Sequence, residues 1–303
     1  MKKWLFLIAG GILFSIFISR IDSRGFLWLQ KISIESLICI IGINATVLFL
    51  KAWRWKYLLS KFDIHLQNRK IFYAVSVGMY LGLVSPGTSG EFGRMIKVPI
   101  KPGLGFLTIA LEKVADLGVL LLISLGGILY WVSPNRGLLL VAIPSLIILS
   151  VMVLGFVKMR IKIFSWIEGI SKRITKREIA WKEILACLGK KDILFIAISV
   201  SFLLWVIPGV QYYLICKAIH TDIAVKSIII SLYTPYLVGV LSMIPFGIGV
   251  FEIGASHLLG RMSSEQEAIG PSLLLFRLLT SLPLVLFGLG CFIKTIAGGR
   301  KEY

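Results

Sequence analysis

The sequence predicts an all-α polytopic membrane protein with six spanning helices and two opposed re-entrant helical hairpins, arranged as an inverted repeat. Three observations support this fold class. Hydrophobic residues make up 57% of the chain, the mean hydropathy is +0.89 and only 16% of residues are charged, which excludes an ordinary soluble domain. Apolar runs alternate with short basic stretches. Two apolar stretches are interrupted by Pro, several Gly and a Glu, which a continuous spanning helix does not need.

The expected spans are apolar runs that approach the roughly 20 residues needed to cross about 30 Å of hydrocarbon. The first run follows Lys2 and Lys3, and no small-residue cleavage site follows it, so we interpret it as a retained helix. The two interrupted stretches, residues 71–100 and 227–260, are the expected hairpins. The expected spans are residues 4–18, 36–50, 114–132, 137–157, 193–215 and 271–293.

The distribution of basic residues indicates whether each interrupted stretch crosses the membrane or returns to the side from which it entered. With a cytoplasmic N terminus and two re-entrant stretches, 25 of the 33 Lys and Arg residues face the cytoplasm and seven face outward. Two full crossings would instead move the basic segment 158–191 outside, against the positive-inside rule. We therefore expect a cell (inner) membrane protein with cytoplasmic termini, whose first hairpin enters from the cytoplasm and whose second enters from outside. Eight full spans with unusual loops are the alternative.

A single transmembrane domain, residues 1–303, is expected to contain two repeat units. The first unit covers residues 36–132 and the second covers residues 193–293. Between them, the segment 158–191 mixes basic and apolar residues, which is typical of an amphipathic helix on the anionic inner leaflet. A solvated connector is the alternative for this segment.

The first interrupted stretch carries the motif SPGTSGEFGR at residues 85–94. A half-helix that starts inside the membrane directs N–H groups and a partial positive charge at its tip, which suits an anion such as phosphate. We expect this half-helix to begin near Ser89 or Gly90, so that Glu91 and Arg94 share one face. The candidate substrate-binding residues here are Ser85, Pro86, Gly87, Thr88, Gly90, Glu91 and Arg94.

The second interrupted stretch repeats this plan with the motif IPFGIGVFE at residues 244–252. Arg277 lies about two turns into the last expected span, and we expect it to be the only Lys or Arg within a continuous span. An ionisable residue inside a membrane marks a functional site, although these charges could instead pair only to hold the hairpins. The candidate substrate-binding residues here are Pro245, Gly247, Gly249, Glu252 and Arg277.

Carboxylates at the expected start of the third span add a further candidate site. Glu112 and Asp116 are four residues apart and could bind a cation, relay a proton or pair with Arg94 and Lys97, and we favour pairing. Gly78 and Gly82 predict a helix-packing contact. The candidate residues for proton or ion coupling are Glu91, Glu112, Asp116 and Glu252.

Other motifs indicate little chemistry. The four Cys residues share no spacing, the three His residues are isolated and no nucleotide-binding motif is present. We therefore expect no cofactor, no metal and no enzymatic activity. The net charge of +18 does not indicate nucleic-acid binding, because the basic residues cluster between apolar runs. Trp53 and Trp55, which alternate with basic residues, predict an interfacial anchor.

The motifs resemble a known family. SPGTSGEFGR followed by LTIALEKVAD at residues 107–116 is similar to the first signature of the lysylphosphatidylglycerol synthase transmembrane-region family, also called the flippase-like domain family. IPFGIGVFE, followed by FRL at residues 276–278 and by Pro283, is similar to the second. The resemblance covers residues 36–293. Thr88 differs from the basic residue that the family often has at this position.

The resemblance implies the lipid-translocating half of the family's bifunctional members, without the soluble synthase domain. The expected function is a flippase-like transporter that moves or binds an anionic phospholipid or a polyprenyl-phosphate-type, lipid-linked headgroup between leaflets. Its expected partners are membrane lipids and a separate synthase or glycosyltransferase. The main alternative is a non-transporting subunit that docks a lipid- or glycan-modifying enzyme through residues 158–191. An embedded enzyme acting on polyprenyl phosphate would need a metal or nucleophile constellation that the sequence lacks.

Overall fold

The computed structural model describes residues 2–19, 30, 32–96, 98–132, 191–221, 223–263 and 266–297. Helices and short connections make up these ranges, and no β-strand occurs within them. The expected all-α class is confirmed. In chain order the elements are α1 (Lys2–Ser19), α2 (Ile34–Ser60), α3 (Asn68–Leu83), η2 (Pro86–Met95), α4 (Pro102–Val132), α7 (Lys191–Ala218), α8 (Val225–Leu241), η3 (Pro245–Gly247), α9 (Val250–Gly260) and α10 (Gln266–Ala297).

Among the described residues, the helices α2, α7 and α10 are long and apolar enough to cross a membrane. Large apolar side chains on them face outward; Ile38 of α2 is 65% exposed and Phe195 of α7 is 69% exposed. Such a surface is stable in hydrocarbon and unfavourable in water. The protein is therefore an all-α membrane protein.

Two helices begin or end well away from their expected bounds. α2 continues to Ser60 instead of ending near residue 50, and α4 begins at Pro102 instead of residue 114. These extensions carry charged residues into the helices, where partners on neighbouring elements compensate the charges. The expected helices were therefore too short, because their bounds were drawn from the apolar residues alone. The expected span 137–157 lies outside the described residues, as does the segment 158–191 apart from Lys191.

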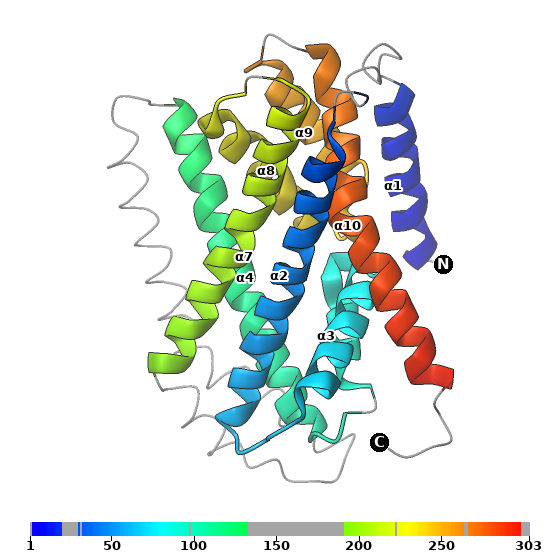
Figure 1. Cartoon of the computed structure of the whole chain (residues 1–303), viewed down its shortest axis with the longest axis vertical. Helices are drawn as coiled ribbons and strands as arrows, with labels where there is room; N and C mark the ends of the chain where they lie inside the picture. Colours follow the sequence, from blue (N-terminus) through cyan, green and yellow to red (C-terminus); the bar gives the residue numbers. More distant parts are fainter. Residues whose placement is uncertain are drawn as a thin grey trace.

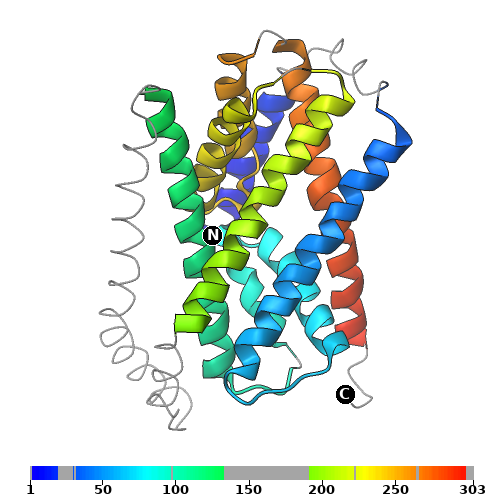
Figure 2. The ribbon, with the colours of Figure 1, turned by 60° about the vertical axis from the view of Figure 1, so that its left-hand side comes forward.

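The two interrupted stretches each fold back on themselves. α3 packs along η2, and α8 packs along α9. Figure 1 places α3 in the half of the molecule nearest the C terminus and α9 in the opposite half. α1 lies beside α9, as Figure 2 also shows.

Close approach of backbones allows the α3–η2 packing. A Cβ added at Gly82 would lie 2.6 Å from Glu91 Cγ, and one added at Gly78 would lie 2.9 Å from Arg94 Cβ. Small residues permit this kind of contact between membrane helices. The predicted packing role of Gly78 and Gly82 is confirmed, and it brings the charged side chains of η2 into the protein interior.

Apolar cores and polar contacts hold the helices together. The larger core joins α7, α8, α9 and α10 around Tyr212, Phe251 and Phe276, and the smaller one joins α2 to α3. At the end of α2, Lys61 donates a 2.5 Å hydrogen bond to Asp192 at the start of α7, and this bond raises the pKa of Lys61. The helices thereby surround the segments that carry the charged motifs.

Candidate functional site

Seven charged side chains from three elements meet beside the first interrupted segment, and we call them the first ionic cluster. Most of them are buried, so each charge needs a partner within the protein. The members are Lys51 and Arg54 of α2, Glu91 and Arg94 of η2, and Glu112, Lys113 and Asp116 of α4.

Glu112 lies at the centre of this cluster between two arginines. Its Oε2 is 2.6 Å from Arg94 Nη1, and its Oε1 is 3.3 Å from Arg54 Nε. Arg94 also reaches Glu91, with 2.7 Å between Arg94 Nη2 and Glu91 Oε2. All of these groups are at most 5% exposed. The favoured pairing of Glu112 with Arg94 is therefore present.

Asp116 joins the cluster to α7. Arg54 holds its two carboxylate oxygens at 2.7 and 3.2 Å, the bidentate geometry that suits an arginine. Ser201 donates a 2.6 Å hydrogen bond to the same carboxylate, and the Trp205 ring N–H donates to the Asp116 carbonyl at 2.8 Å. Asp116 therefore pairs with Arg54 and not with the expected Arg94, while Lys97, the other expected partner, lies outside the described residues.

Arg54 belongs to the cluster and Trp55 lies 5.4 Å from the Arg94 guanidinium, although the alternation of Trp53 and Trp55 with Lys51, Arg54 and Lys56 predicts an interfacial anchor. Arg54 and Trp55 are both fully buried, whereas Trp53 is 41% exposed and stacks on Tyr57. The anchor interpretation is therefore wrong for Arg54 and Trp55. A signal was present, because Lys51, Arg54 and Trp55 are spaced i, i+3 and i+4 and share one helix face.

Two lysines form the most exposed cationic part of the cluster, and both are bound to one oxygen. Lys113 Nζ is 2.5 Å and Lys51 Nζ 3.3 Å from Glu91 Oε1. Lys113 also donates a 3.2 Å hydrogen bond to Thr88. Their side chains are 20% and 16% exposed, against at most 1% for the two arginines. With every group ionised, four positive charges face three negative ones.

Helical backbone in the first motif resumes near Ser89, where the half-helix was expected, although as 3-10 turns. Gly87 and Thr88, with φ of 57° and 59°, interrupt the stretch Pro86–Met95, and the turns after this kink carry Glu91 and Arg94. Ser85 Oγ accepts a 2.5 Å hydrogen bond from the Gly90 N–H and closes the turn. A Cβ at Gly90 would lie 2.0 Å from the Leu81 carbonyl oxygen, so only glycine fits there.

The second interrupted segment holds a smaller group of side chains, the second ionic cluster. Arg277 Nε donates a 2.7 Å hydrogen bond to Glu252 Oε1. The guanidinium carbon of Arg277 lies 4.3 Å from the Phe246 ring centre, 4.2 Å from that of Phe251 and 5.7 Å from that of Tyr236. Such cation–π contacts stabilise a buried arginine. Arg277 Nη2 is buried and has no hydrogen-bond partner among the described residues.

The N terminus of α9 already meets a carboxylate of the chain. Gly249, with a φ of 83°, precedes the helix, and its N–H donates a 2.6 Å hydrogen bond to Glu252 Oε2. The anion at the predicted tip is thus Glu252 in this structure. A Cβ at Gly249 would lie 2.3 Å from Leu13 Cβ, so α1 closes this tip, a contact that no motif in the sequence indicates.

The remaining predicted residues of the second motif shape its backbone. Pro245 begins η3, and Gly247, with a φ of 60°, lies close to Gly239 of α8. The expectation that Arg277 would be the only basic residue of a continuous span is wrong, because the span formed by α2 includes Lys51 and Arg54. The two ionic clusters therefore both draw on spanning helices.

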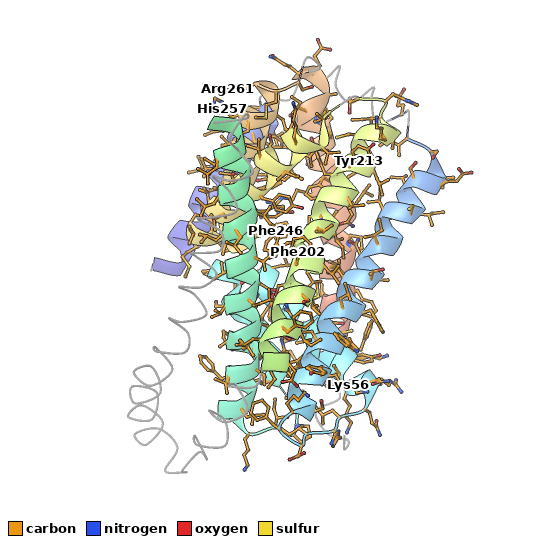
Figure 3. The ribbon with its side chains drawn as sticks, turned by 90° about the vertical axis from the view of Figure 1, so that its left-hand side faces the viewer. Lys56, Phe202, Tyr213, Phe246, His257 and Arg261 are labelled. Carbon is orange, nitrogen blue, oxygen red and sulfur yellow. The ribbon has the colours of Figure 1, made fainter. Side chains whose placement is uncertain are left out.

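The two interrupted segments contact each other. A Cβ at Gly87 would lie 2.6 Å from Met243 Sδ, so these residues are in contact. Thr88, Met243 and Phe246 have positive φ, a conformation that is costly for non-glycine residues and that the surrounding structure must hold in place. In Figure 3, Phe246 lies near mid-height, between His257 at one end and Lys56 at the other. The contact thus lies deep between the two ends.

Comparison with known proteins identifies the family. Residues 4–288 match the family model described as the lysylphosphatidylglycerol synthase TM region. The chain belongs to this family. The sequence is also similar to a UPF0104 membrane protein from Methanothermobacter thermautotrophicus, with 23% identity over 239 residues that cover 68% of this chain and 69% of the relative. The resemblance inferred from the motifs is confirmed.

The site of this lysylphosphatidylglycerol synthase TM region protein is built from ion pairs. Within the described ranges, no group of three or more His, Cys, Asp or Glu residues is arranged to hold a metal ion. The first ionic cluster carries a cationic surplus, and the second has an arginine whose Nη2 has no described partner. Both features suit an oxyanion such as phosphate, which accepts charge-assisted hydrogen bonds from Lys and Arg.

Proposed function

We propose that this protein binds the phosphate of an anionic lipid headgroup and moves the lipid between the two leaflets. The observation that carries the proposal is the cationic surplus of the first ionic cluster. Four cationic and three anionic groups share a largely buried space, and Lys51 and Lys113 converge on one oxygen of Glu91. A buried surplus charge is costly unless an anion compensates it, and a phosphate would do so.

The two lysines are the groups that an incoming phosphate would engage. They are more exposed than the arginines, and Glu91 would keep Arg94 as a partner after both lysines turned away. The arginines are each held by carboxylates, so they would fix the surrounding charges while the lysines exchange partners. Headgroup binding would thus change few of the buried contacts.

Arg277 would receive the headgroup on the other side of the contact between Gly87 and Met243. Its Nε is committed to Glu252, whereas its Nη2 has no partner among the described residues. An arginine fork matches the geometry of a phosphate. In this proposal the headgroup passes between the two clusters while its acyl chains stay in lipid.

The proposed topology is six spans and two opposed re-entrant hairpins, with both termini in the cytoplasm of a cell membrane. Two hairpin-like packings, α3 on η2 and α8 on α9, support it, since they lie in opposite halves of the molecule. Residues 36–132 and 193–293 are the proposed inverted repeats. Irregular backbone at membrane depth is tolerated where protein covers it or where it lines a cavity, and Pro245, Gly247 and Gly249 are buried.

The proposed substrates are anionic phospholipids or polyprenyl-phosphate-type lipids. The description of the family names lysylphosphatidylglycerol synthase, which supports a phosphatidylglycerol-type headgroup. The lysines and arginines of the two clusters would supply the contacts to its phosphate. Transport driven by a proton or ion gradient would use the carboxylates Glu91, Glu112, Asp116 and Glu252.

Reconstituted vesicles test this proposal. The protein is placed in vesicles that contain tail-labelled phosphatidylglycerol, and the labelled lipid reaching the other leaflet is measured with and without a pH gradient of each sign. Lys51→Gln combined with Lys113→Gln should slow transport strongly because the cationic surplus is lost. Lys56→Gln is the matched control, since Lys56 lies on the same helix, is exposed and binds only Asn68 among the described contacts.

Two results would contradict lipid transport. One is a wild-type rate equal to that of protein-free vesicles under every gradient. The other is an unchanged rate in the Lys51→Gln, Lys113→Gln variant, provided that it reaches the vesicles in a folded form. A protein-free rate together with stable co-purification of a lipid- or glycan-modifying enzyme would support the docking-subunit alternative.

A further inference from the structure

A pocket of about 260 Å³ lies at one end of the protein, away from both ionic clusters. Its walls come from the first turns of α3, the connection after η2 and the last turns of α10. α3 begins and α10 ends in the half of the molecule nearest the C terminus (Figure 1). Because α10 is one of the helices that can cross a membrane, its last turns mark the boundary between lipid and water.

Three cationic side chains line this pocket. Arg69 and Lys70 come from the first turn of α3, and Lys294 comes from the last turns of α10. Within the described part of the chain, no carboxylate forms an ion pair with any of the three. Arg69 lies over the ring of Tyr73, which also lines the pocket, at 5.8 Å. Their combined field favours an anion.

The local helix geometry makes the field more positive. Cations in the first turn of a helix add to the positive end of its dipole, an arrangement that an anionic ligand would relieve. The first turn of α3 contains no acidic residue, and the side chain of Gln67 at its N-cap does not cap it. The cations of α3 are therefore uncompensated by their own helix.

The inner wall of the pocket is apolar. Ala74 and Val77 of α3 are buried there, and Val98 contributes from the connection after η2. A small, fully hydrated anion gains nothing from such a wall, whereas the glycerol and first methylenes of a lipid do. The volume of about 260 Å³ lies just below the roughly 300–1,000 Å³ range of small-molecule pockets, which suits a headgroup whose tails lie outside.

We propose that this pocket, the basic pocket, binds the phosphate headgroup of an anionic membrane lipid. The site goes beyond the proposed transport function, because it contains no member of either ionic cluster. Its occupant would tie the connection that follows η2 to α3 and α10. Lipid bound here therefore stabilises the folded protein independently of any lipid that is transported.

Equilibrium binding to purified protein in an uncharged detergent tests the site. The probes are dioctanoyl phosphatidylglycerol, dioctanoyl phosphatidylcholine and inorganic phosphate, and native mass spectrometry counts the bound molecules while thermal unfolding reports stabilisation. We expect phosphatidylglycerol to bind and to raise the unfolding temperature, with little effect of the other two probes. Arg69→Gln combined with Lys294→Gln should weaken that binding by roughly tenfold or more.

Two further variants distinguish lipid binding in the pocket from non-specific attraction of the anionic lipid to basic residues on the surface. Val98→Trp keeps every charge but fills the pocket, and it should weaken phosphatidylglycerol binding as well. Lys101→Gln removes an exposed cation that does not line the pocket, and it should leave binding unchanged. All measurements are repeated in the Lys51→Gln, Lys113→Gln background, so that loss of the proposed substrate site is distinguished from loss of the basic pocket.

Several results would overturn the inference. Phosphatidylcholine binding as tightly as phosphatidylglycerol would show that the charge is not recognised. A second such result would be inorganic phosphate that binds as tightly as phosphatidylglycerol does, and equally to wild type and to Val98→Trp. That result would show that the three cations bind a free anion and not a lipid. Unchanged phosphatidylglycerol binding in both Val98→Trp and the Arg69→Gln, Lys294→Gln variant would show that the lipid does not bind in the basic pocket.

Discussion

Arg277 of α10 donates a 2.7 Å hydrogen bond from Nε to Glu252 in the first turn of α9, and three aromatic rings surround its guanidinium. The other oxygen of Glu252 accepts from the Gly249 N–H. One carboxylate therefore links the last spanning helix to the tip of the second interrupted segment. A change at Arg277 should thus alter both stability and lipid handling.

Arg277→Ala should lower the free energy of unfolding by about 3–5 kcal/mol, because it strands a buried carboxylate. Arg277→Lys should be milder in stability but should still slow lipid transport, since an ammonium cannot reproduce the arginine fork. Thermal unfolding in detergent and the vesicle assay measure the two effects.

The double variant Arg277→Gln, Glu252→Gln should regain stability relative to Arg277→Ala. If the double variant also regains transport, Arg277 is only a structural ion-pair partner.

Glu112→Gln should be more damaging than Lys51→Gln, although both remove one charge from the first ionic cluster. Glu112 compensates both Arg54 and Arg94, so its loss leaves two buried arginines short of charge and should cost about 3 kcal/mol or more. Glu91 keeps Arg94 and Lys113 when Lys51 is removed, so that loss should be smaller. Chemical unfolding of the two variants compares them, and an equal loss would contradict a central role for Glu112.

Gly90→Ala should destabilise the protein by roughly 2 kcal/mol or more, because the new Cβ would overlap the Leu81 carbonyl oxygen and force α3 away from η2. Gly42→Ala is the matched control, since nothing lies within 4 Å of the added Cβ in the middle of α2. It should change stability by about 1 kcal/mol or less. Thermal unfolding of both variants tests the packing, and a Gly90→Ala protein as stable as wild type would exclude it.

Single cysteines should report the proposed topology. In a background without native cysteines, a cysteine at Lys101 should react with an impermeant reagent only from the cytoplasmic side. A cysteine at Arg261 should react only from the outside, because the second hairpin is proposed to enter from that face. Both positions are exposed in the structure. Labelling of the two cysteines from the same face would be incompatible with opposed hairpins.

The charged motifs of the candidate site were predictable from sequence because charges inside apolar runs are rare and need compensation. Glu91, Arg94, Glu252 and Arg277 were all recognised this way. Arg54 was missed because a basic residue near a tryptophan at a helix end is also typical of an interfacial anchor. Its true environment depends on Asp116 and Ser201, which are distant in sequence.

Composition and the length of the apolar runs by themselves determined that the chain is an all-α membrane protein, and two Pro–Gly–Glu motifs marked where its helices break. These features are local, because lipid imposes the same length and polarity on any spanning segment. Only the tertiary structure decided which charges pair, that Glu252 rather than an external anion caps α9, and that α1 closes that tip at Gly249. Ion pairs act over a few ångströms, so packing selects the partners of a buried charge among residues far apart in the chain.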